Sequence, residues 1–113
     1  MSAVQMFPIG DSEVFEDYYV ADVQREGIDR VWYIYHTAPY EGSGCAVFER
    51  DGRFNEANLG HCSCYGPWDR SIPNRESDVD SLDALQAKCS REYYADELKP
   101  CFDAARAALA ESA

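Results

Sequence analysis

Residues 30–37 read RVWYIYHT, a run dense in β-branched and aromatic side chains that predicts a β-strand. Alternate side chains of a strand point to opposite faces of its sheet. We therefore expect Val31, Tyr33 and Tyr35 on one face and the even-numbered residues, beginning with Trp32, on the other. Because both sets are largely apolar, the strand is expected to be at least partly covered on both sides.

A β-hairpin is predicted directly after this strand, with residues 45–50 and 53–59 as its two arms. The turn is Asp51-Gly52, a pair typical of the type I′ turn, in which both residues take positive φ angles. A two-residue turn at this position places Cys45 opposite Asn58 in the antiparallel pair.

The segments around these strands have weaker patterns. Residues 1–10 are expected to form an irregular N-terminal lead-in, and residues 38–44 a loop or a glycine-bearing bulge. Residues 11–24 fit a short helix that runs into a strand, and residues 60–75 are expected to be irregular.

Two helices are predicted to end the chain. Apolar residues recur at three- and four-residue steps over residues 79–93, with Ser77 or Ser81 as the candidate N-cap. A second apolar stripe covers residues 98–109, and Pro100 is expected in the first turn of that helix.

Strands followed by helices predict an α+β fold in a single domain of residues 1–113. We expect a small antiparallel sheet of three or four strands, with its hairpin turning at Asp51-Gly52, packed against the C-terminal pair of helices.

The composition excludes several classes of protein. The 113 residues include 21 acidic and 10 basic side chains, and the formal net charge is −11. This charge repels phosphate backbones, so direct nucleic-acid binding is not expected. The longest apolar run, residues 31–35, is about a quarter of the length that a transmembrane helix needs, so no membrane association is expected.

The cysteines indicate a reducing compartment. Their number is odd, and the first basic residue is Arg25, so the charged start of a secretory signal is missing. We expect reduced thiols in a cytosol, with those at Cys89 and Cys101 buried on the apolar stripes of the two helices. The five cysteines are Cys45, Cys62, Cys64, Cys89 and Cys101.

Acidic residues are concentrated in two segments that contain no basic residue. They are expected to form an interaction surface that steers a positively charged partner towards the protein. The first segment contains Asp11, Glu13, Glu16, Asp17 and Asp22, and the second contains Glu76, Asp78, Asp80 and Asp83.

Residues 60–68, GHCSCYGPW, bring an imidazole and two thiols into one short stretch. His61, Cys62 and Cys64 are zinc-ligand types, and Cys45 is a candidate fourth ligand. Only one such ligand knuckle is present, however, and Cys45 lies about 13 Å along the strand from the position that faces Cys62. A second alternative is a catalytic thiol activated by His61.

We favour a structural interpretation of this stretch, in which a rigid loop holds neither a metal nor another cofactor. The residues of this structural motif are His61, Cys62, Cys64, Tyr65, Gly66, Pro67 and Trp68.

Residues 40–44 (YEGSG), the Asp51-Gly52 turn and residues 59–68 (LGHCSCYGPW) resemble a signature of small uncharacterised proteins, many of them encoded by bacteriophages. The resemblance covers residues 33–68. It implies no catalytic residues. It implies a small phage-type protein made in the cytoplasm of a bacterial host, where such proteins often bind and redirect host machinery.

These observations together favour a non-enzymatic acidic protein that binds a host or phage macromolecule, in particular a protein with a basic surface. One alternative is a DNA mimic, similar to some anti-CRISPR proteins, which inhibits a nucleic-acid-binding defence protein of the host. Another alternative is a small zinc-binding module that uses His61, Cys62 and Cys64.

Overall fold

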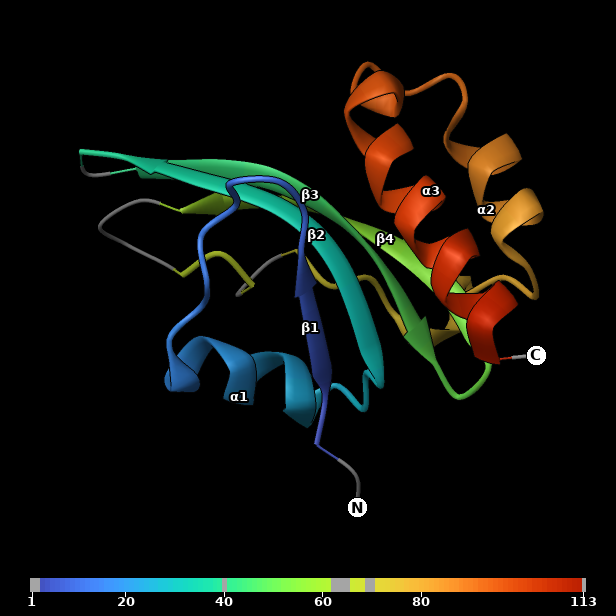
Figure 1. The fold of residues 1–113 in the computed structure, drawn as a ribbon, viewed down its shortest axis with the longest axis horizontal. Helices are drawn as coiled ribbons and strands as arrows, with labels where there is room; N and C mark the ends of the chain where they lie inside the picture. The colour runs from blue at the N-terminus through green and yellow to red at the C-terminus, as the bar shows by residue number, and fades with distance from the viewer. Residues whose placement is uncertain (1–2, 40, 62–65, 69–70, 113) are drawn as a thin grey trace.

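The computed structural model describes residues 3–39, 41–61, 66–68 and 71–112 of the chain. These residues include a four-stranded mixed sheet with helices on both faces, which confirms the α+β class (Figure 1). The strands are β1 (Gln5–Pro8), β2 (Arg30–Ala38), β3 (Glu41–Arg50) and β4 (Arg53–His61). The helices are α1 (Asp17–Arg25), α2 (Leu82–Cys89) and α3 (Ala95–Ser112), with a short 3₁₀ helix at Arg75–Ser77.

The strands follow one another across the sheet in chain order. β2, β3 and β4 are antiparallel, as expected, whereas β1 pairs parallel with β2, and α1 lies in the connection between them. The prediction of an irregular lead-in is therefore wrong for β1. Pro8 is tolerated because it ends an edge strand, and the next residue, Ile9, donates its N–H to the Tyr33 carbonyl at 2.9 Å.

The predicted hairpin is confirmed in both turn and register. Asp51 and Gly52 have φ angles of 54° and 76°, and Cys45 pairs with Asn58. The expected loop or bulge at residues 38–44 is wrong from Glu41 onwards, because β3 begins there. Gly44 makes this pairing possible, since a Cβ at position 44 would collide with the backbone carbonyl oxygen of Ile34 in β2.

The two faces of the sheet carry separate apolar cores. Val31, Tyr33 and Tyr35 point towards α1, and Trp32 points towards α2 and α3, which confirms the alternation predicted for β2. Figure 1 shows α1 beneath one face and the α2–α3 pair against the other. The sheet is thus the middle layer of three.

The helices differ from the sequence prediction in three details. Residues 11–24 do not run into a strand, because α1 continues to Arg25. Of the two candidate N-caps for α2, Ser81 is the one whose hydroxyl accepts a hydrogen bond, from the Ala84 N–H at 3.0 Å. Pro100 is the sixth residue of α3 rather than a first-turn residue, since that helix already begins at Ala95.

None of the helices in the described residues combines the length and the apolar character that a membrane span requires.

Candidate interaction site

A pocket of about 220 Å³ opens on the α1 side of the sheet, where the chain enters α1 beside the end of β2. We call it the acidic aromatic pocket. It is defined here by Glu13, Phe15, Glu16, Tyr18, Tyr19 and Tyr35, and Val14 and Thr37 complete its lining. Its volume is below the range of about 300–1,000 Å³ that is typical of small-molecule sites, so it suits one side chain better than a metabolite.

Four aromatic rings form the apolar part of the acidic aromatic pocket. Phe15 is buried and lies between Tyr35 and Tyr19, with ring centroids 4.9 and 6.2 Å away. The ring of Tyr18 is 57% exposed and packs on Tyr19 at a centroid distance of 4.1 Å. A buried ring therefore forms the floor, and a half-exposed ring forms the rim.

Two tyrosines of this pocket stay neutral at physiological pH. The pKa of Tyr18 is raised, first by its hydrogen bond with Tyr19 and then by desolvation and by the Glu16 carboxylate. Burial, Tyr19 and Glu13 raise the pKa of Tyr35 to about 12. The negative charge of the pocket therefore comes from its carboxylates.

The backbone and side chain of Glu13 are fixed against the end of β2. Its N–H donates to the Tyr35 carbonyl at 3.0 Å, and its carbonyl accepts from the Tyr33 hydroxyl at 2.8 Å. The Thr37 hydroxyl donates to its carboxylate. Asp17 lies in the first turn of α1, where an acidic side chain stabilises the helix dipole. Glu13 precedes the helix by several residues, so the helix dipole does not account for an acidic residue at that position.

Gly66, Pro67 and Trp68, the last residues of the motif at residues 60–68, support the aromatic wall of this pocket. Trp68 is buried and packs on Phe15 with ring centroids 5.3 Å apart. Gly66 lies so close to Tyr19 that an added Cβ would be 2.7 Å from a ring carbon. Pro67 is also fully buried. These residues position the aromatic wall and do not line the cavity.

The first acidic segment remains largely uncompensated by basic side chains. Glu13, Glu16 and Asp17 are exposed, and within the described part of the chain no Lys or Arg forms an ion pair with them. Asp11 is 3.7 Å from the His36 imidazole, and Asp22 pairs with Arg25. The field around the acidic aromatic pocket is therefore negative.

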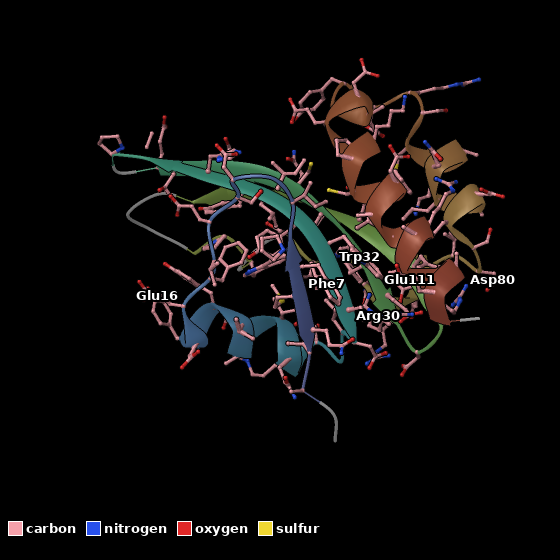
Figure 2. The ribbon with its side chains drawn as sticks, viewed as in Figure 1. Phe7, Glu16, Arg30, Trp32, Asp80 and Glu111 are labelled. Carbon is pink, nitrogen blue, oxygen red and sulfur yellow. The ribbon has the colours of Figure 1, made fainter. Side chains whose placement is uncertain are left out.

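The second acidic segment is mostly neutralised within the fold. Asp80 pairs with Arg53 at 3.0 Å, and Asp83 pairs with Arg106 at 2.6 Å. Figure 2 shows Glu16 at the start of α1 and Asp80 on the other side of the molecule, near α2. Glu76 is exposed. The two segments therefore do not form one continuous acidic surface.

The expectation that Asp78 belongs to an exposed interaction surface is wrong. Its side chain is 3% exposed and accepts two hydrogen bonds from the Arg50 guanidinium, at 2.8 and 2.9 Å. Asn55 donates a third at 2.9 Å. The sequence shows Asp78 among other acidic residues, but its partners come from β3 and β4, far away in the chain.

The zinc hypothesis rests mostly on residues outside the described part of the chain. His61 is the last residue of β4, and Cys62, Cys64 and Tyr65 lie outside the described residues. The thiol of Cys45, the fourth candidate ligand, is 1% exposed and donates to the Glu97 carbonyl of α3 at 3.4 Å. Among the described residues there is no group of three His, Cys, Asp or Glu side chains that could hold a metal ion.

Sequence reasoning found the carboxylates of the acidic aromatic pocket but missed its rings. Phe15, Tyr18 and Tyr19 interleave with acidic residues over positions 13–19, and this pattern was the available signal. Tyr35 was not predictable as a neighbour, because the backbone pairing of residue 13 with β2 brings it there.

Comparison with known protein families, curated proteins and solved structures finds no match for the chain.

Proposed function

We propose that this protein is a non-enzymatic binding protein whose acidic aromatic pocket takes a basic side chain, arginine or lysine, of a partner protein. The observation that carries this proposal is the combination of aromatic rings around one small cavity with exposed carboxylates that form no ion pair with a Lys or Arg among the described residues. Aromatic faces attract cations through their quadrupole, with a gain of about 0.5–2 kcal/mol that depends on desolvation. Glu13 and Glu16 add direct charge attraction at the same place.

The surrounding charge supports the same partner chemistry. The net charge of −11 and the exposed carboxylates at residues 13–17 would accelerate association with a basic surface and repel an acidic one. The sequence resemblance to phage-type proteins favours the bacterial cytoplasm as the setting and a host or phage protein as the partner.

DNA mimicry receives less support than this general role. A mimic needs an extended array of exposed negative charges that follows a phosphate backbone. In this protein Asp78 is buried against Arg50, and Asp80 and Asp83 are each paired with an arginine. Only the first acidic segment is available for such a role.

Affinity capture from bacterial lysate with matched variants tests this proposal. Glu13→Gln/Glu16→Gln removes two charges at the pocket, and Glu76→Gln/Asp80→Asn removes two exposed charges elsewhere. We expect a protein that the wild type and the control variant retain at low salt, and that high salt releases. The pocket variant should retain it about tenfold less, which corresponds to a loss of about 1.4 kcal/mol. Equal retention by the pocket variant and the control would contradict the proposal.

A further inference from the structure

Two cysteines outside the acidic aromatic pocket lie together between β3 and α3. Cys45 is 1% exposed and Cys101 is fully buried. The Cys45 thiol donates to the carbonyl of Glu97, one turn before Cys101 in α3, at 3.4 Å. The Cys101 sulfur is 3.9 Å from the carbonyl oxygen of Cys45. Each thiol therefore contacts the backbone next to the other cysteine.

The two thiols also affect each other unequally. The neighbouring Cys101 thiol lowers the pKa of Cys45. The neighbouring Cys45 thiol, together with burial, raises the pKa of Cys101. Cys45 is thus the cysteine that loses its proton more readily, and a thiolate is the form of cysteine that reacts with oxidants.

A small pocket reaches Cys45, the cysteine of the pair that lines it. Its volume is about 320 Å³, it lies between the second half of β2, the first half of β3 and the early turns of α3, and its wall includes Cys45, Glu97 and Pro100. A hydroperoxide is small enough to enter such a space.

We propose that Cys45 and Cys101 form a redox pair that a hydroperoxide converts into a disulfide between β3 and α3. With hydrogen peroxide, the Cys45 thiolate attacks one oxygen and forms an S–O bond, the O–O bond breaks, and the departing hydroxide takes a proton to become water; with an organic hydroperoxide an alkoxide departs and becomes the alcohol. The Cys101 sulfur then attacks the sulfenic acid at Cys45. The S–S bond forms as the S–O bond breaks, and hydroxide leaves with the Cys101 proton as a second water. The two sulfurs are oxidised by two electrons in total, and the peroxide is reduced.

Cys89 provides an internal comparison for this chemistry. It is also buried, on α2, and burial raises its pKa to about 11. It should therefore react more slowly with peroxide than Cys45. Trypsin separates the three cysteines, since cleavage after Arg and Lys, except at the Lys99-Pro100 bond, places Cys45 in residues 31–50, Cys89 in residues 89–91 and Cys101 in residues 92–106.

The test uses full-length protein with Cys62→Ser and Cys64→Ser, treated with an equimolar amount of hydrogen peroxide, then unfolded, alkylated and digested. We expect peptides 31–50 and 92–106 linked, with the loss of two hydrogen atoms, and Cys89 alkylated. With Cys101→Ser added, Cys45 should stop at a sulfenic acid that a 1,3-diketone traps. The same peptide mapping on peroxide-treated wild-type protein gives a second measurement that does not depend on the folding of any variant. Alkylation of both Cys45 and Cys101 after peroxide treatment of wild-type protein would overturn the proposal, and so would a disulfide that joins either of them to another cysteine.

Discussion

Arg50 and Asp78 form a two-point ion pair in the interior, with guanidinium Nε 2.9 Å from one carboxylate oxygen and Nη2 2.8 Å from the other. Their side chains are 1% and 3% exposed. Arg50 also donates to the carbonyls of Pro73 and Glu26, at 3.0 and 3.4 Å. One arginine at the end of β3 thereby holds the C-terminal end of α1 and the segment that leads to α2.

The Asp78→Asn substitution should therefore destabilise the fold. Removal of one member of a buried ion pair leaves an uncompensated charge and costs about 3–5 kcal/mol. Asp80→Asn is the matched control, because Asp80 is exposed and its pair with Arg53 is worth about 1 kcal/mol or less. Urea denaturation measures both effects. Similar losses for the two variants would show that the buried pair is not the anchor that its geometry indicates.

The same pair should make stability fall in acid. Burial alone raises the pKa of Asp78, but hydrogen bonds from Arg50 and Asn55 outweigh it and hold the pKa below its ordinary value. A carboxyl with a depressed pKa in the folded state stabilises the protein above its unfolded pKa of about 3.9, and this stability is lost as pH falls through the folded value. Urea denaturation from about pH 7, roughly three units above the unfolded pKa, down to about pH 3, roughly one unit below it, should show a steeper acid loss for the wild type than for Asp78→Asn. If the stability of the two proteins fell in parallel with pH, the lowered pKa of Asp78 would be contradicted.

Glu56 should have the opposite effect on the pH dependence of stability. Its Oε1 accepts from the Tyr94 hydroxyl at 2.9 Å, whereas its Oε2 is buried and has no hydrogen-bond partner among the described residues. Burial raises the pKa of Glu56, so the folded protein becomes more stable as pH falls from neutrality through the folded pKa towards the unfolded value.

Glu56→Gln is therefore expected to stabilise the protein at neutral pH, by up to about 1 kcal/mol, because it removes the partly buried charge. The gain should shrink towards about pH 4, near the unfolded pKa of the carboxyl, where Glu56 is protonated in the wild type. Glu92→Gln, at an exposed position of the same neighbourhood, is the control. A destabilised Glu56→Gln variant at neutral pH would show that the carboxylate has a partner of its own.

Ser81 should contribute to stability as the N-cap of α2. Its hydroxyl accepts from the Ala84 N–H, which otherwise has no partner within the helix. Ser81→Ala should cost about 1 kcal/mol in urea denaturation, and Ser81→Asp should retain most of the stability because Asp also caps. If alanine and aspartate gave the same stability, the cap would not matter.

Local signals in the sequence predicted the centre of the fold well. The β-rich run at residues 30–37 predicted β2, and the Asp51-Gly52 turn predicted the β3–β4 hairpin and its register, because alternation and turn type depend on neighbouring residues alone. β1 was not predicted, because it depends on pairing with a distant strand rather than on local sequence. Its four residues have no alternation of their own and become a strand through pairing with β2.

The candidate site likewise has features that the sequence predicts and features that it does not. Charge is visible in a sequence, so Glu13 and Glu16 were identified, but the burial of a charge is not visible. Asp78 and Asp80 are two residues apart and read alike, yet Arg50 holds one inside the fold and the other is exposed. Only the packing of β3 against the segment before α2 distinguishes them.

The most direct test of the acidic aromatic pocket is an NMR titration of ¹⁵N-labelled protein with a short peptide that carries one arginine between glycines. The control peptide replaces arginine with citrulline, which keeps the shape and removes the charge. We predict saturable shifts confined to amides of residues 13–19 and 35–37, with a Kd on the order of 1 mM for one side chain, and loss of these shifts in Glu13→Gln/Glu16→Gln. Equal responses to the two peptides, or arginine-dependent shifts centred elsewhere, would contradict the account.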